Sequence, residues 1–158
     1  MYPIILALHN IMRWIIILLA IYALVRVYMG VFGKREFTET DRKALSFYAI
    51  GMDIQLLLGL ILYFFLSPIT TAALGNFGAA MSNDAMRFFA VEHILMMVVA
   101  VVLAHVATMM AKRGATSSSK FNRAAIWLTL SVLAVLAAIP WQPDRLLPQF
   151  TALLQMFA

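Results

Sequence analysis

Residues 87–106 read RFFAVEHILMMVVAVVLAHV, and only Arg87, Glu92, His93 and His105 among them are polar or charged. An apolar run of about 20 residues is long enough to cross the roughly 30 Å hydrocarbon core of a membrane as a helix. Ionisable side chains are costly there and are usually paired or functional. The stretch therefore predicts a transmembrane helix and raises the question of what lies opposite its histidines.

The composition of the whole chain is that of an integral membrane protein. Of its 158 residues, 64% are hydrophobic and 12% are charged, whereas soluble domains contain about 45–50% apolar residues. Four apolar stretches are each long enough to span a bilayer: residues 3–29, 44–66, 86–111 and 121–139. We predict an all-α integral membrane fold, an up-down four-helix transmembrane bundle in residues 1–141 with an interfacial C-terminal segment in residues 142–158.

The chain contains no cysteine, which excludes disulfides, thiolate metal sites and covalent c-type haem attachment. The first apolar stretch lacks a basic leader region and is too long for a signal peptide, so we interpret it as a retained helix. The sequence has no nucleophile–base pattern, phosphate loop or dinucleotide motif, so an independent hydrolase, kinase or dehydrogenase is not expected. A role as one component of an oxidoreductase complex stays open.

The distribution of positive charge predicts the orientation. Nine of the twelve lysine and arginine residues lie in or beside two connections, residues 33–43 and 112–123. Cytoplasmic loops carry an excess of such residues. We therefore predict a multi-pass protein of the bacterial inner membrane with both termini in the periplasm. Because topology accounts for the net charge of +5, no nucleic-acid partner is predicted.

Two histidines are expected at the same depth in the membrane. His9 lies six residues after the start of the first span, and His93 lies seven residues after the start of the third. At 1.5 Å per residue both lie about 10 Å below the outer surface. The first and third spans are parallel and diagonal in a simple up-down bundle. Facing imidazoles are what a b-type haem with two axial histidines requires, although a lone histidine is also explained by a hydrogen bond across helices.

The surroundings of this level suit a flat cofactor. Gly59 on the second span lies at the same height, where a missing side chain lets a bulky ligand approach. Arg13 follows His9 by one turn, and Arg87 stands at the outer mouth, so both are predicted partners of haem propionates; Arg13 alternatively pairs with Glu92. The fourth span contributes small residues near its outer end: Ala134, Ala137 and Ala138.

A second polar pair is predicted deeper in the bundle. His105 lies twelve residues after His93, about 18 Å further along the helix, and cannot bind the same iron. Asp53 lies at a comparable depth, and a buried contact between the two would lower the desolvation cost of each. The pair is either a contact that locks two helices or a quinone or proton site. Since no further histidine lies at that depth, one haem is predicted.

Several segments together resemble a known family. LHNIMRW (8–14), QLLLGLILYFFLSP (55–68), RFFAVEH (87–93) with MM (96–97), and AAIPW (137–141) resemble small bacterial four-helix membrane proteins described as cytochrome b-like. The resemblance covers about residues 2–141. It implies a membrane electron carrier that holds haem, with His9 and His93 as the ligands.

Three functional classes follow. The first is a membrane electron-transfer protein or respiratory-complex subunit with one b haem near the periplasmic face, whose redox partner is a quinol or a cytochrome. The second is a haem-free accessory subunit that packs against other membrane subunits. The third is a small transporter with a polar path through Arg13, Glu92, Asp53 and His105. The visible absorption spectrum of the purified protein separates the first class from the other two.

Overall fold

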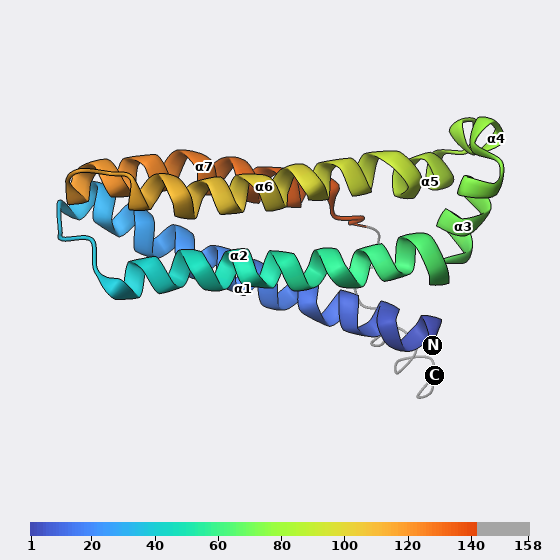
Figure 1. Ribbon diagram of the computed structural model, residues 1–158, viewed down its shortest axis with the longest axis horizontal. Helices are drawn as coiled ribbons and strands as arrows, with labels where there is room; N and C mark the ends of the chain where they lie inside the picture. Colours follow the sequence, from blue (N-terminus) through green and yellow to red (C-terminus); the bar gives the residue numbers. More distant parts are fainter. Residues whose placement is uncertain (142–158) are drawn as a thin grey trace.

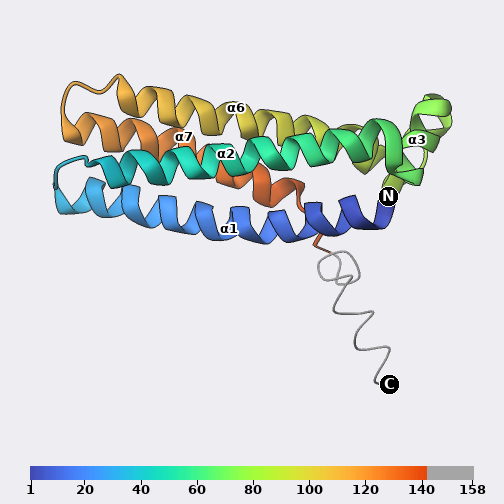
Figure 2. The same ribbon diagram turned by 60° about the horizontal axis from the view of Figure 1, so that its bottom comes forward.

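The computed structural model describes residues 1–141, which form helices and no strands (Figure 1). Four long helical segments lie side by side, and short helices close one end (Figures 1 and 2). The elements in chain order are α1 (Tyr2–Gly33), α2 (Glu39–Ile61), the π-helical turn η1 (Leu62–Leu66), α3 (Pro68–Gly75), α4 (Phe77–Met81), α5 (Asp84–Arg87), the π-helical turn η2 (Phe88–Glu92), α6 (His93–Lys112) and α7 (Ser117–Ala138).

The prediction of four long apolar helices is confirmed. Tyr2–Gly33, Glu39–Leu66, Asp84–Lys112 and Ser117–Ala138 are each long and apolar enough to cross a membrane. Each begins one to five residues before the predicted span, and the first also continues four residues past its predicted end. The connection between the second and third long segments contains the short helices α3 and α4. The predicted segment 142–158 lies outside the described residues.

Local sequence signals explain where the helices begin. Thr38 and Asp41 form a capping box at the start of α2, in which each side chain accepts from the backbone of the other residue. The Ser67 side chain accepts from the Thr70 backbone and begins α3, directly before Pro68 at the first helical position. Asn83 caps α5 in the same way, accepting from the backbone of Met86. These caps satisfy donors that the first turn of a helix leaves without partners.

The four long segments form a ring of neighbours. α1 packs against α2 and α7, and α6 packs against α2 and α7. Successive segments run in opposite directions along the long axis (Figures 1 and 2). Consequently α1 and α6 lie diagonally across the core, run in the same direction, and turn one face toward each other.

The interior is rich in small residues, and many of the larger apolar side chains point outward. α6 carries a buried stripe of alanines where it packs against α7: Ala100, Ala104, Ala107 and Ala111. Leu18, Leu57 and Phe65 on the outer surface are 67%, 62% and 76% exposed. Soluble proteins place most large apolar residues inside, whereas helices packed in lipid approach closely through small residues. The pattern is compatible with helices that span a membrane.

A buried hydrogen-bond chain ties three helices together at mid-height. Ser131 of α7 donates to the backbone carbonyl of Ala100 on α6, with 2.7 Å between the oxygens. Because the single hydroxyl proton of Ser131 is used there, Tyr48 of α2 donates to the Ser131 hydroxyl at 2.9 Å. Tyr48 and Ser131 are almost completely buried. The chain sets the rotation of these helices about their own axes.

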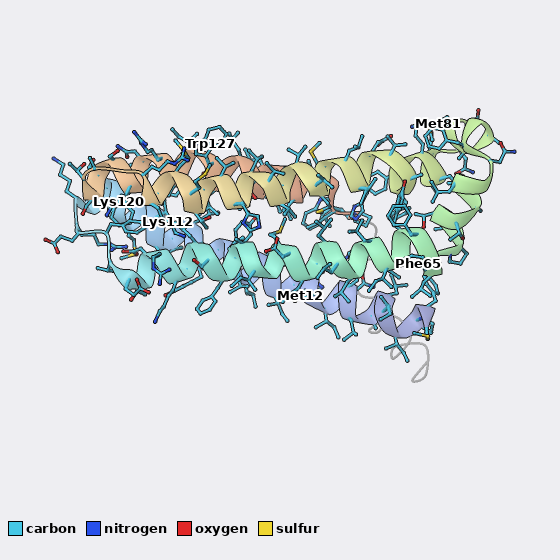
Figure 3. The ribbon with its side chains drawn as sticks, viewed as in Figure 1. Met12, Phe65, Met81, Lys112, Lys120 and Trp127 are labelled. Atoms are coloured by element: carbon cyan, nitrogen blue, oxygen red, sulfur yellow. The ribbon has the colours of Figure 1, made fainter. Side chains whose placement is uncertain are left out.

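One end of the molecule carries most of the positive charge. Lys112 and Lys120 lie at the end formed by the connections between α1 and α2 and between α6 and α7 (Figure 3). Within this end the fully buried Asp41 carboxylate accepts from Arg26 Nε at 2.9 Å and from both terminal nitrogens of Arg35 at 2.7 and 2.6 Å. This cluster joins the end of α1 to the first turn of α2.

Candidate functional site

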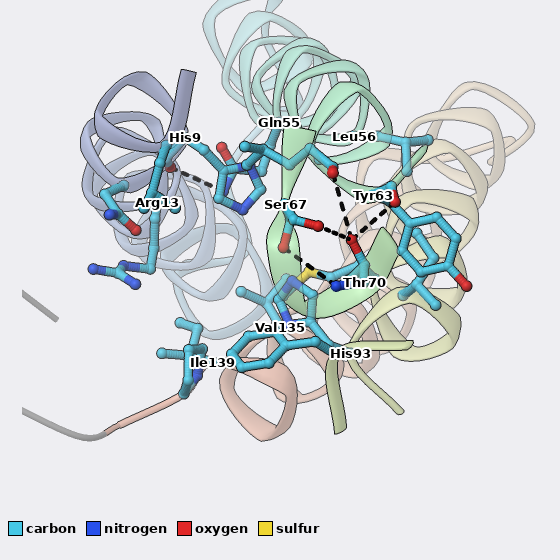
Figure 4. Close-up of a pocket in the computed structure, with 18 of the residues that line it drawn as sticks. His9, Arg13, Gln55, Leu56, Tyr63, Ser67, Thr70, His93, Val135 and Ile139 are labelled. Carbon is cyan, nitrogen blue, oxygen red and sulfur yellow. Dashed lines mark hydrogen bonds between the residues drawn. The ribbon is translucent and has the colours of Figure 1, made fainter. Parts of the chain in front are cut away.

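The rings of His9 and His93 meet across the core between α1 and α6. Their centroids are 6.4 Å apart and their planes are inclined by 60°. Figure 4 shows both side chains turned toward the same cavity. His9 and His93 were predicted to lie at the same depth, and in the structure their two rings are neighbours.

A π-helical turn directly precedes His93. η2 ends at Glu92, and Tyr63, within the other π-helical turn η1, donates its hydroxyl to the Ala90 carbonyl at 2.8 Å. π-Helical turns interrupt regular helices and occur often at functional sites. The rings of Phe88 and Phe89 each lie 5.9 Å from the His93 ring, centroid to centroid. The His93 ring is thus supported by aromatic neighbours from its own helix.

A backbone carbonyl determines which ring nitrogen of His93 carries its proton. Nδ1 of His93 lies 2.8 Å from the carbonyl oxygen of Ala138 at the end of α7. A carbonyl only accepts, so Nδ1 is the donor and carries hydrogen. In the neutral ring Nε2 then keeps a lone pair. Histidines that bind metals commonly make this hydrogen bond with their other nitrogen.

His9 is placed differently. Its Nδ1 is buried and has no hydrogen-bond partner among the described residues. A Cβ atom added at Gly59 would lie 3.3 Å from Cε1 of His9, so the absent side chain makes room for the His9 ring. Gln55 of α2 donates Nε2 to the His9 backbone carbonyl at 3.1 Å. Gly59, which was predicted to flank a cofactor, is thus a packing partner of His9.

The two histidines line a cavity of about 350 Å³ that residues of all four long segments enclose. This volume is at the lower end of the range for ligand pockets, about 300–1,000 Å³. Most of the lining is apolar and includes Met97, one turn after His93. Arg13, which is only 7% exposed, also lines the cavity and lies over the Trp14 ring at 5.7 Å. The cavity therefore combines two imidazoles, one buried cation and an apolar wall.

The donor set restricts the kind of group that fits. Among residues 1–141 no cluster of three or more histidine, cysteine or acidic side chains is close enough to hold a bare metal ion, and structural zinc sites need four such ligands. Two facing imidazoles suit a metal that brings its own equatorial ligands, as haem iron does. With a metal about 2.0–2.1 Å from each nitrogen and each nitrogen about 1.1 Å from its ring centre, the centroids would be about 6.3 Å apart. The observed separation of 6.4 Å fits this geometry.

Other residues that were predicted at the site do not line the cavity. Arg87 does not line the cavity; its side chain is 42% exposed and forms ion pairs with Asp84 and Glu92, both at 3.0 Å. Glu92, the alternative partner expected for Arg13, is thus occupied by Arg87. On α7, Ala134 and Ala138 are buried and Ala137 is exposed. The cavity wall there consists of Val135, Ile139 and Pro140.

Asp53 and His105 form the expected contact but are not buried. His105 Nε2 lies 2.8 Å from an Asp53 carboxylate oxygen, and the two side chains are 53% and 44% exposed. Both side chains are partly exposed, and the contact joins α2 to α6. The prediction of a buried pair was wrong, because depth along a helix gives the height of a residue and not the direction in which it points.

The structure adds polar residues that the sequence analysis did not assign to the site. Asn10 and Gln55 are nearly buried and line the cavity, and Oε1 of Gln55 has no partner among the described residues. Thr70 and Tyr63 also contribute to the lining. Asn10 and Gln55 are polar residues within apolar spans, which is a signal that marks functional candidates. Thr70 gave no such signal because it lies in the connection after the second span.

Comparisons of the chain with protein-family models, with curated proteins and with solved structures found no match. The site is therefore interpreted from its own geometry.

Proposed function

We propose that this protein is a membrane electron-transfer protein, or a subunit of a respiratory complex, that holds one b-type haem between His9 and His93. The observation that carries the proposal is the pair of facing imidazoles, whose centroids are 6.4 Å apart at a cavity within the bundle. A bound haem would supply one-electron oxidation and reduction. Membership of the cytochrome b-like proteins, which the sequence resembles, is included in this proposal.

The residues of the chain have separate roles in this proposal. His9 and His93 would each hold the haem through one ring nitrogen, and the Ala138 carbonyl orients His93. Arg13 provides a buried positive charge close to His9 and is suited to offset a propionate carboxylate. Arg87 is already paired with two carboxylates on the surface, so we no longer assign it to the cofactor.

The proposed location is the bacterial inner membrane. Four helices long and apolar enough to span a bilayer support insertion, and their large outward-facing apolar side chains suit contact with lipid. The positive end, which carries nine of twelve lysine and arginine residues, would face the cytoplasm. The cavity lies toward the opposite end, so the haem would be near the periplasmic face, accessible to a quinol, a cytochrome or another membrane subunit.

The experiment is the absorption spectrum of protein purified from cells with ample haem. We expect a strong Soret band, sharp α and β bands after reduction, and about one haem per chain in a pyridine assay. His9→Ala and His93→Ala should each abolish the low-spin spectrum. His105→Ala is the matched control, since it removes a histidine from the same helix as His93 but outside the cavity, and should leave the spectrum unchanged.

A colourless protein would refute the proposal. The accessory-subunit function would then be the better one, with the exposed Asp53 and His105 pair as a polar contact for a neighbouring subunit. A haem whose spectrum changes equally in His105→Ala and His93→Ala would also contradict the assigned ligands.

A further inference from the structure

The two histidines are held with unequal firmness. His93 has a fixed tautomer because its Nδ1 donates to the Ala138 carbonyl at 2.8 Å. Two phenylalanine rings, Phe88 and Phe89, also lie against it at 5.9 Å. For His9 the described residues supply neither a hydrogen bond to its buried Nδ1 nor an aromatic neighbour other than His93 itself. The ring of His9 therefore lacks the hydrogen bond and the phenylalanine contacts that hold His93.

This difference affects how strongly each ring binds a metal. A hydrogen bond from the second nitrogen of a histidine to a carbonyl orients the ring and raises its basicity, and its loss typically weakens metal binding about 10–100-fold. His93 has this bond and His9 does not. Of two axial ligands on one metal, His9 is thus the weaker.

His9 packs against the backbone of Gly59, and its ring also borders the cavity of about 350 Å³. The lining near both histidines is largely apolar, including Leu6, Leu56 and Ile94. A ring that moves away from the metal would leave room for a small neutral molecule in an apolar environment.

We infer that His9 is an exchangeable ligand and that the reduced site binds a small neutral diatomic molecule, of the class of carbon monoxide and nitric oxide, on the His9 side. This inference rests on the proposed haem function. It adds to electron transfer a ligand-binding function at the same iron, with His93 as the permanent ligand.

The test uses carbon monoxide and two variants at one position. Gly59→Ser places a hydroxyl next to His9, where its oxygen can accept from Nδ1 while its proton goes to the helix backbone. Gly59→Ala adds the same Cβ atom without the acceptor and is the matched control. We expect the reduced wild-type protein to bind carbon monoxide, and Gly59→Ser to bind it about tenfold more weakly than Gly59→Ala.

A second measurement does not depend on Gly59. Transfer of haem to an excess of apomyoglobin should be at least tenfold faster from His93→Ala than from His9→Ala, because the firmly held ligand is lost only in the former. Three outcomes would each overturn the inference: haem-loaded wild-type protein that does not bind carbon monoxide, equal carbon monoxide affinities of the two Gly59 variants, or equal rates of haem transfer from the two histidine variants. The proposal that the protein binds haem would still stand. A haem-free protein would instead refute the proposed function.

Discussion

Replacing Asp41 with asparagine should destabilise the protein without affecting the cavity. Asp41 is fully buried and forms ion pairs with Arg26 and Arg35. Asp41→Asn keeps the size of the side chain but removes its charge and turns one acceptor oxygen into a donor that faces a guanidinium group. Breaking a buried ion pair from one side costs about 3–5 kcal/mol.

The lower end of this range applies here, because the two arginine side chains are 27% and 28% exposed and stay partly hydrated. A loss of about 3 kcal/mol corresponds to a decrease in Tm of about 6–12 °C for a chain of this length. Thermal unfolding in mild detergent, followed by circular dichroism, measures this change.

A nearby exposed ion pair provides the control. Glu39 pairs with Arg42 in the same turn of α2, and the two side chains are 57% and 47% exposed. Exposed pairs of this kind contribute little to stability, so Glu39→Gln should lower the Tm far less than Asp41→Asn does. If Asp41→Asn and Glu39→Gln have the same Tm, the buried cluster does not stabilise the junction of α1 and α2. The spectrum of the proposed haem should be the same in both variants, since the cluster lies at the far end from the cavity.

Two further predictions concern the surface and the orientation. A double-mutant cycle with Asp53→Asn and His105→Ala should give a coupling energy of about 0.6 kcal/mol, as is typical of polar contacts between membrane helices, and strictly additive losses of stability would mean that the 2.8 Å contact is not energetically relevant. A reporter enzyme that works only in the cytoplasm should be active when fused after residue 38, and one that works only in the periplasm should be active when fused after residue 158. The reverse pattern would invert the topology and move the cavity to the cytoplasmic face.

Helical rise alone was sufficient to predict the height of residues in the bundle. His9 and His93 were placed at one level by counting residues from the ends of two apolar stretches, and their rings do meet. The same counting paired Asp53 with His105 correctly. Both results follow from the constant rise of about 1.5 Å per residue, which depends little on packing.

The direction in which a residue points was harder to predict. It depends on the contacts between helices and on local changes of helical pitch, such as the π-helical turn before His93. For this reason Asp53 and His105 were expected inside and lie outside, and Arg87 was expected at the cofactor and pairs with Asp84 and Glu92. The backbone carbonyl that orients His93 was not predictable from side-chain identities, because any residue at position 138 supplies one.

The end of α7 is one structural unit with the imidazole of His93. In a continuing helix the carbonyl of Leu136 would accept from the backbone nitrogen of residue 140, but Pro140 has no hydrogen to donate. The indole of Trp141 takes its place, donating to the Leu136 oxygen at 2.9 Å. The Ala138 carbonyl is likewise released from helical bonding and accepts from His93. The position at which Pro140 ends α7 therefore decides which carbonyl His93 contacts. Through that contact, the length of α7 determines which ring nitrogen of His93 carries the hydrogen and which one is left to bind a metal.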